Sequence, residues 1–140
     1  MPRAPETLIF SAPKSFLMLL LAVMSASAAA AWVAIGGNDV SNTYADPATI
    51  LKAGDKVKMR HLVDFNSVQV KASGRRYLSE KLQYEYDCKE EQARMLNFSS
   101  HSGNMGGGVM VEGDFHPGKW KPLPPGSVVA YLRKFACAKP

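Results

Sequence analysis

The sequence predicts an α+β domain in which a short C-terminal helix covers one face of an antiparallel β-sheet of about six strands. Three observations lead to this fold class. Short segments of alternating apolar and polar residues follow one another through the chain, with connections of hairpin length. Helical spacing of apolar residues stands out once, close to the C-terminus. The strand–helix alternation of a parallel nucleotide-binding sheet does not occur in the sequence.

The first 30 residues have the layout of a secretory signal peptide. Arg3 and Lys14 supply positive charge before an apolar run at residues 16–24, and small residues with several Ala-x-Ala sequences follow. This order is typical of exported proteins, and its apolar core is too short to cross a bilayer. We therefore predict a signal peptide over residues 1–30 and a single domain over residues 31–140.

An uncleaved anchor is the alternative, because no charge lies between Lys14 and Asp39, and such a stretch is long enough to cross a hydrocarbon core. The small residues, and the β-like segment 32–35 after them, favour cleavage after Ala28 or Ala30. No cysteine follows the apolar run closely enough for lipid attachment. The expected destination is the periplasm, the cell surface or the medium, with no stable membrane span after cleavage.

The chain is mildly basic, with 17 Lys and Arg residues, 12 Asp and Glu residues and a net charge of +5. Loss of Arg3, Lys14 and Glu6 with the signal peptide leaves +4. This charge permits contact with anionic glycans, membrane surfaces or acidic proteins. It is lower than that of a dedicated nucleic-acid binder, so we predict no nucleic-acid partner.

Alternation and turn residues place the strands in order at residues 32–35, 43–45, 57–65, 82–88, 92–99 and 109–111. Residues 46–50 predict a turn or a single helical turn, with Asp46 as its cap and Pro47 at the first helical position. In segment 82–88 the alternation places Cys88 on the apolar face. The same alternation places Glu85 and Asp87 on the outward face, which we expect to be solvated and charged.

The predicted helix begins after a proline-rich approach at residues 122–125, with Ser127 as its N-cap. Its apolar stripe consists of Val128, Tyr131, Leu132 and Phe135, at helical spacing. Two basic residues, Arg133 and Lys134, are expected in the last turn, where positive charge suits the helix dipole. So short a helix needs a surface to pack against.

The two cysteines, Cys88 and Cys137, both lie in the predicted mature domain. An even count in an exported chain favours a disulfide, and only one pairing exists. A redox-active pair is the alternative, but such cysteines usually lie close together in sequence. Closing a loop of about 50 residues stabilises a domain by roughly 4 kcal/mol in the chain-entropy model.

No motif predicts catalysis, and we expect a non-enzymatic protein without cofactor or metal. The glycine segment 103–108 lacks the Lys-Ser/Thr ending and the following helix of a phosphate-binding loop, so a hairpin connection is expected. The histidines, His61, His101 and His116, lack the close spacing of a zinc site. The serines that flank His101 form no recognisable triad, and no nucleophile elbow occurs.

A basic cluster accompanies Tyr77 and consists of Lys71, Arg75, Arg76 and Lys81. It suits an anionic glycan or an acidic protein patch, although a solubilising loop is the favoured interpretation. Trp120 could anchor a partner, but its place beside the prolines favours packing at the entry to the helix. The ligand-binding residues therefore stay unknown at this point.

Several segments resemble the surface-adhesin protein E family. The resemblance spans Trp32 to Cys137 and is carried, in order, by Tyr44–Ile50, Glu85–Cys88, Met105–Val109, and Trp120 with the prolines before Cys137. It implies a six-stranded antiparallel sheet with a C-terminal helix tethered to its concave face by the disulfide. It also implies adhesion to host matrix and serum proteins such as laminin and vitronectin, and homodimer formation. No binding residue is carried over, because the matching positions are scaffold positions.

The leading functional hypothesis is an exported binding domain that recognises proteins or glycans at or outside the cell envelope. A periplasmic accessory or stress-related protein without an adhesive role is the alternative, and a small hydrolase or lyase is the third interpretation. Adhesion requires display outside the cell, whereas catalysis requires polar groups that converge in a pocket. The sequence contains no motif of convergent polar groups.

Overall fold

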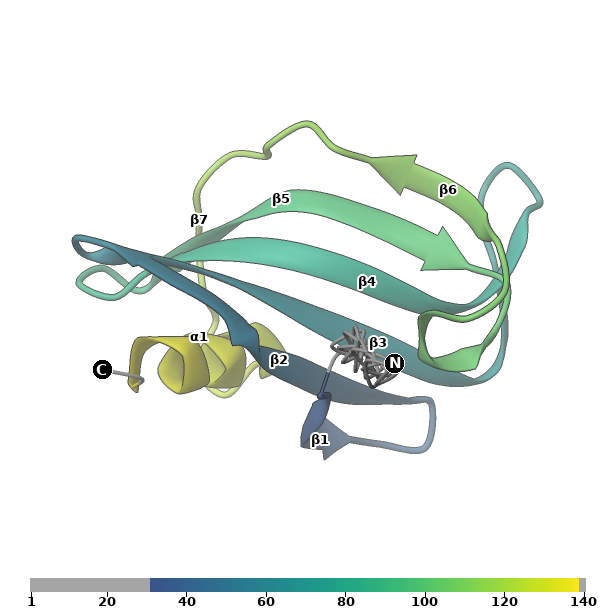
Figure 1. The fold of residues 1–140 in the computed structure, drawn as a ribbon, viewed down its shortest axis with the longest axis horizontal. Helices are drawn as coiled ribbons and strands as arrows, with labels where there is room; N and C mark the ends of the chain where they lie inside the picture. The colour runs from purple at the N-terminus through teal and green to yellow at the C-terminus, as the bar shows by residue number, and fades with distance from the viewer. Residues whose placement is uncertain (1–30, 139–140) are drawn as a thin grey trace, which may run out of the picture.

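Residues 31–138 are described by the computed structural model, and the predicted signal peptide lies outside the described residues. Six antiparallel strands follow one another in chain order across one sheet (Figure 1). These strands are β1 (Val33–Gly37), β2 (Ser41–Ala53), β3 (Lys56–Val70), β4 (Arg76–Asp87), β5 (Gln92–His101) and β6 (Met110–Asp114). A two-residue strand, β7 (Lys121–Pro122), pairs with β5 and leads to the helix α1 (Val128–Ala138). The predicted α+β fold is confirmed.

The turn or helical turn predicted at residues 46–50 is wrong, because this segment lies inside β2. The pairing of β2 with β3 shifts its register between Asp46 and Leu51. Asp46 Oδ1 accepts a hydrogen bond from the Ala48 N–H at 3.2 Å, and Thr49 Oγ1 accepts one from the Arg60 N–H at 2.8 Å. These side chains replace ladder bonds where Pro47 has no N–H to donate, so the strand bulges and then continues.

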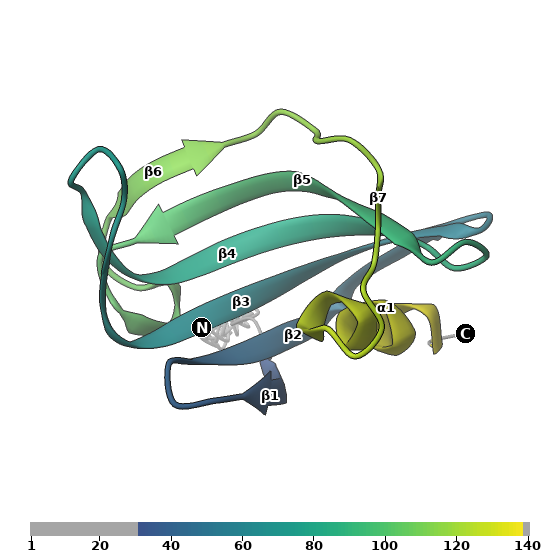
Figure 2. The same ribbon diagram turned by 180° about the vertical axis from the view of Figure 1, so that it is seen from behind.

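Helix α1 lies across one end of the sheet, against β2 and β3 in the view of Figure 2. Leu132 and Ala136 are fully buried and join a core cluster supplied by the strands, which comprises Ala45, Val57, Met59, Tyr86 and Ala93. Ser127 is the N-cap as predicted, since its Oγ accepts the Ala130 N–H at 3.2 Å. In the described part of the chain, no helix has the length and hydropathy needed to span a membrane.

The face of α1 that packs on the sheet differs from the predicted stripe. Val128 and Tyr131 are 49% and 56% exposed, whereas Leu132 is buried and Phe135 is partly buried. The partly buried Val129 takes the place of Val128 against the core. Cys137 must face the sheet to reach Cys88, so the residues one and two turns before it, Arg133 and Val129, share its face.

Neither predicted basic residue sits in the last turn, because α1 continues to Ala138 beyond Arg133 and Lys134. Arg133 instead reaches the end of β4. Its guanidinium donates to the carbonyl oxygen of Asp87 at 2.7 Å and to that of Cys88 at 3.0 Å. These two bonds satisfy carbonyl groups where β4 ends. The side chain predicted to complement the helix dipole therefore fixes the helix to the chain beside the disulfide.

Candidate binding surface

The predicted disulfide between Cys88 and Cys137 is present, and its Cα atoms lie 5.7 Å apart. Cys88 directly follows β4, and Cys137 lies in the last turn of α1. Both side chains pack against the buried core. No free cysteine occurs among residues 31–138, so the disulfide fastens the helix to the sheet and leaves no thiol there for redox or nucleophilic chemistry.

On the sheet face that carries α1, three rings lie in a row. The His61 and Tyr84 ring centroids are 5.0 Å apart, and those of Tyr84 and Tyr86 are 6.0 Å apart. His61 Nδ1 and Tyr86 Oη are buried and form no hydrogen bond with described residues. Burial lowers the pKa of His61 to about 4 and raises the pKa of the Tyr86 phenol. Both groups are therefore uncharged at neutral pH.

This shift makes the stability of the domain depend on pH. Between the ordinary histidine pKa of 6.5 and about 4, the unfolded chain binds a proton at His61 and the folded chain does not. The contribution of neutral His61 to the free energy of unfolding is therefore complete above pH 6.5 and is lost as the pH falls toward 4. We expect His61 to account for a loss of about 2 kcal/mol in the free energy of unfolding between about pH 7 and about pH 5.

Urea denaturation at a series of pH values measures this loss. The His61→Leu variant should lose less stability than the wild type over the same range. The matched control is His116→Leu, at a side chain that is 95% exposed, and it should keep the wild-type dependence. Parallel pH profiles for the wild type and His61→Leu would contradict this assignment.

The glycine segment 103–108 is an anchored turn rather than a simple hairpin connection. It contains the 3₁₀ turn η1 (Asn104–Gly106), whose Met105 N–H donates to Asp64 Oδ1 at 2.7 Å. Ser79 Oγ donates to the Gly103 carbonyl at 2.6 Å and accepts the Gly106 N–H at 2.8 Å. The Met105 and Gly106 N–H groups already donate hydrogen bonds within the protein. They are therefore used for structure and are not free to bind a phosphate.

Glu85 and Asp87 do not lie on a solvated face as predicted, since they are only 8% and 3% exposed. Their side chains lie on the face of the sheet away from α1, which we call the far face. Lys56 Nζ lies 3.0 Å from Asp87, and Arg94 lies 2.7 Å from Glu85. The Glu90 backbone N–H, with a further hydrogen bond from Lys56, holds the pKa of Asp87 well below its usual range.

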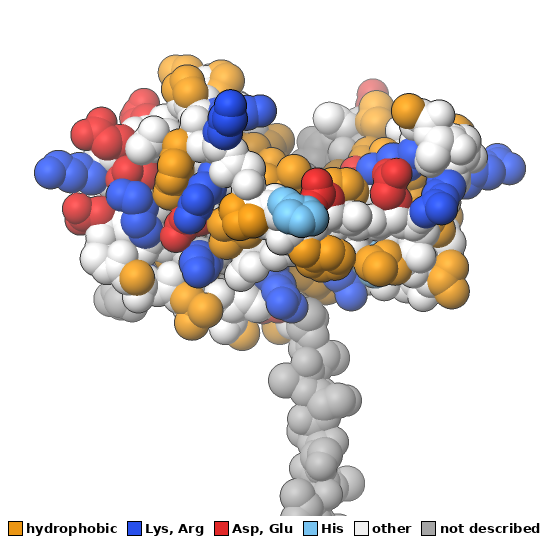
Figure 3. Space-filling view, turned by 90° about the horizontal axis from the view of Figure 1, so that it is seen from above, with side chains coloured by type: hydrophobic (Ala, Val, Ile, Leu, Met, Phe, Trp, Pro, Cys, Tyr) orange, Lys and Arg blue, Asp and Glu red, His pale blue; other side chains and the backbone are white. Residues whose placement is uncertain are grey.

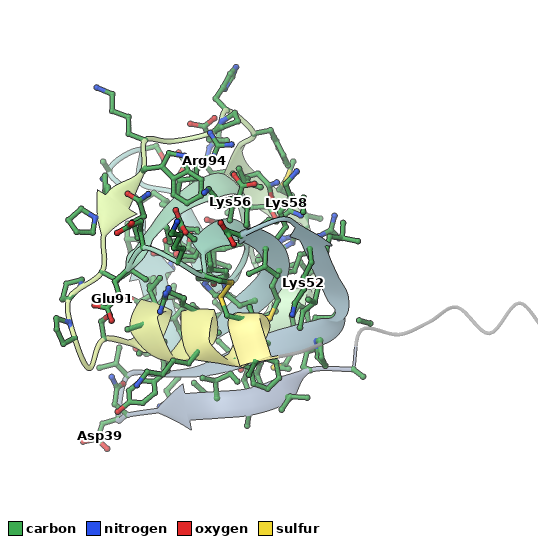
Figure 4. All side chains as sticks on the ribbon, turned by 90° about the vertical axis from the view of Figure 1, so that its left-hand side faces the viewer. Asp39, Lys52, Lys56, Lys58, Glu91 and Arg94 are labelled. Atoms are coloured by element: carbon green, nitrogen blue, oxygen red, sulfur yellow. A yellow bond between two sulfur atoms is a disulfide. The ribbon has the colours of Figure 1, made fainter. Side chains whose placement is uncertain are left out.

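Trp120 covers the Lys56–Asp87 and Arg94–Glu85 ion pairs. Its ring lies 5.6 Å from Lys56 Nζ and 5.1 Å from the Arg94 guanidinium carbon. The prediction that Trp120 packs rather than stands free is right, but it packs on the far face and not at the helix entry. Sequence alternation could not show that a segment beyond β6 returns to cover charged residues, which is why Glu85 and Asp87 were expected in solvent. Figure 4 shows Lys56, Lys58 and Arg94 together, with Lys52 nearer to α1.

The structure divides the predicted basic cluster. Lys71 Nζ lies 3.0 Å from Glu80 and 3.8 Å from Glu112, and 4.4 Å from the centre of the Tyr77 ring. Arg75 donates to the Val111 carbonyl. These contacts occupy the charged groups of Lys71 and Arg75, which the basic cluster was expected to offer to a partner. Lys81 follows Glu80 on β4, so its side chain points to the opposite face of the sheet.

A second group of basic residues comes together on the far face through strand register. Residues directly opposite each other in an antiparallel pair share a face. Lys58 lies opposite Glu85, Arg60 opposite Gln83, and Lys81 opposite both Leu62 and Ser99. Lys58, Arg60 and Lys81 are exposed and form no ion pair with any residue in the range 31–138. Their charges are available to a partner.

A hollow of about 260 Å³ lies on this face. Arg60, Lys81 and Ser99 line it, together with Trp32 before β1, Phe115 after β6, Asp46 and Leu82. Phe115 is 62% exposed. Figure 3 shows the molecule from above, on the side of β6, where hydrophobic, basic and acidic side chains lie among one another. Among the residues that line the hollow, Lys81 belongs to the predicted basic cluster, and the others share no motif that could have revealed them.

Another hollow, of about 280 Å³, lies between β5, the segment 118–123 and α1. Its lining includes Ala93, Leu123 and Val129, which also belong to or pack against the core. A ligand there would compete with the packing of α1 on the sheet. The far-face hollow lies on the opposite side of the sheet, so it is the better candidate for a binding surface.

The histidines have separate surroundings. His61 is buried, His101 Nε2 lies 2.8 Å from Ser99 Oγ, and His116 Nδ1 lies 2.8 Å from Asp114 Oδ1. Burial, with the nearby charge of Lys81, lowers the pKa of His101. In the described range, His, Cys, Asp and Glu side chains form no group of three or more that could hold a metal ion.

The model of the family named surface-adhesin protein E matches residues 32–138. Among solved structures, the fold is similar to that of Haemophilus influenzae protein E, with a TM-score of 0.58 and 14% identity over 76% of this chain and 83% of the other. A second crystal form gives the same TM-score and identity over 74% and 91% of the two chains. Protein E from non-typeable Haemophilus influenzae gives a TM-score of 0.56. No curated protein sequence matches the chain.

Proposed function

The chain belongs to the surface-adhesin protein E family, and we propose that it is an exported, non-enzymatic domain that binds proteins or glycans outside the cell or at its envelope. Family membership implies export. The layout of residues 1–30 supports export through a signal peptide. The domain that follows has its helix fixed by a disulfide, as suits a protein that works in an oxidising compartment.

The observation that carries the proposal is the far face. The exposed ring of Phe115 and the partly buried ring of Trp32 lie with exposed basic side chains around a hollow, and such a combination is typical of recognition surfaces. The residues that flank it are held by ion pairs and by the covering ring of Trp120. A surface whose side chains are already held in place loses little conformational entropy when it binds a partner.

Fractionation of the native host, with and without protease treatment of intact cells, tests export and display. We expect the protein in the medium, or on the surface in a protease-sensitive form, with a periplasmic marker protein as the protected control. The secreted or surface protein is then tested for binding to matrix proteins and to glycans. Protection inside the periplasm would contradict the adhesive part of the proposal and redirect the search to envelope partners.

A further inference from the structure

We propose that the far-face hollow binds an acidic polysaccharide, with sulfate or carboxylate groups on Arg60 and Lys81 and sugar rings against Trp32 and Phe115. This inference rests on the proposed function and names the chemical class of its ligand. It depends on three properties of the hollow, which are its charge, its aromatic rims and its polar floor.

The charge of the hollow is unbalanced. Arg60 and Lys81 line it and have no ion-pair partner within residues 31–138, whereas Lys56, Lys71 and Arg94 each pair with a carboxylate. The acidic residue in the lining, Asp46, is 5% exposed and its Oδ1 accepts the Ala48 N–H. A guanidinium beside an ammonium group presents several donors to an anionic oxygen, and a free guanidinium can bind sulfate or carboxylate in bidentate fashion.

Aromatic rings stand at both rims. Val33 pairs with Ala45 on the face that carries α1, so Trp32, one residue earlier, shares the far face with Asp46. At the other rim Phe115 lies over Gly113, where an added Cβ would come within 3.2 Å of the ring. Flat rings of this kind bury the apolar C–H faces of sugars, while the sugar hydroxyl groups stay free for polar partners.

Polar groups lie between the rims. Ser99 lines the hollow, and its Oγ lies 2.8 Å from His101 Nε2. Gln83 and Asn97 lie beside the lining, because Gln83 is opposite Arg60, and Asn97 Nδ2 donates to Gln83 Oε1 at 3.0 Å. Amide and hydroxyl groups offer both donors and acceptors to sugar hydroxyl groups. The row of Arg60, Gln83 and Asn97 crosses β3, β4 and β5, and Lys58 adds positive charge two residues before Arg60 along β3. A chain of charged sugars matches this extended row better than a single small anion does.

Other polyanions fit less well. A net charge of +5 for the whole chain is low for nucleic-acid binding. A membrane surface is broad and flat, whereas Arg60 and Lys81 line a hollow with an aromatic residue at each rim. The hollow therefore favours a narrow polymer that can enter between Trp32 and Phe115.

Surface plasmon resonance with immobilised heparin oligosaccharides tests the proposal, using the full chain purified in its oxidised form. The double variant Arg60→Gln/Lys81→Gln should bind about tenfold more weakly than the wild type, since two exposed ion pairs are lost. The matched control, Lys52→Gln/Lys134→Gln, removes the same charge from exposed residues, of which Lys134 lies on α1. It should change the affinity less than about twofold.

Two further measurements separate the contribution of ring stacking from that of charge. Trp32→Ala should weaken heparin binding but keep its salt dependence, because stacking is not screened by salt. Fully desulfated heparin should bind much more weakly than heparin at the same salt concentration. Circular dichroism and the denaturation midpoint of each variant establish that it is folded before its affinity is compared.

Several results would overturn the proposal. Equal losses in the double variant and its control would show that net charge alone governs binding. Tighter binding to a single-stranded oligonucleotide or to anionic phospholipid vesicles than to heparin would assign the surface to another polyanion. If matrix proteins bind but no acidic polysaccharide does, the proposed function stands and the carbohydrate inference fails. If the protein remains protected in the periplasm while heparin binds in vitro, the adhesive role fails and the site remains.

Discussion

Replacing Cys137 by serine is expected to lower the free energy of unfolding by about 4 kcal/mol. The disulfide joins residues separated by 49 positions, so its loss restores the conformational freedom of a long loop to the unfolded chain. Helix α1 has 11 residues and depends on its contact with the sheet. A loss of this size is a large part of the ~5–15 kcal/mol that stabilises a typical domain.

Urea denaturation followed by circular dichroism measures this effect. Reductant should destabilise the wild type to the level of Cys137→Ser and should leave the variant unchanged, which controls for any effect of the serine itself. Unequal midpoints for the reduced wild type and the variant would point to lost side-chain packing. An unchanged midpoint in both would show that the disulfide does not stabilise the fold.

The second large effect is expected from Leu132→Ala, which should cost about 3 kcal/mol. Leu132 is fully buried in the cluster with Val57, Met59 and Tyr86, so its truncation removes apolar contacts and leaves a cavity. The matched control is Tyr131→Ala on the same helix. Tyr131 is 56% exposed, and its truncation should change stability by less than about 0.5 kcal/mol.

Equilibrium denaturation of both variants with the disulfide intact gives the comparison. The contrast between neighbouring residues tests which face of α1 packs on the sheet. If Tyr131→Ala proved as costly as Leu132→Ala, the helix would be rotated toward the stripe that the apolar spacing predicts. Similar small losses in both would mean that the disulfide and Arg133, rather than packing, hold the helix in place.

Both effects concern the scaffold, whereas the proposed binding residues lie on the far face. Arg60 and Lys81 take no part in the core that holds α1. Their substitution should therefore change affinity with little change in stability. This separation permits independent tests of the fold and of the binding surface.

Features that depend on near neighbours along the chain follow from the sequence alone. Alternation in segments 57–65 and 82–88 set which side of the sheet each side chain faces, because successive side chains in a strand point to opposite sides. Ser127 set the start of α1 through its own hydrogen bond to the Ala130 N–H. The cysteine count allowed one intramolecular pairing, and Cys88 with Cys137 forms it.

Features that depend on residues distant along the chain follow from the packing of the whole domain. The tether at Cys137 rotates α1 so that Val129 packs and Val128 does not. Trp120 returns to cover the ion pairs of Glu85 and Asp87, although alternation marks both carboxylates as outward. Arg60 and Lys81 share one hollow because of the register between strands, and register is fixed by pairing and burial across the whole sheet rather than by the local period of either strand.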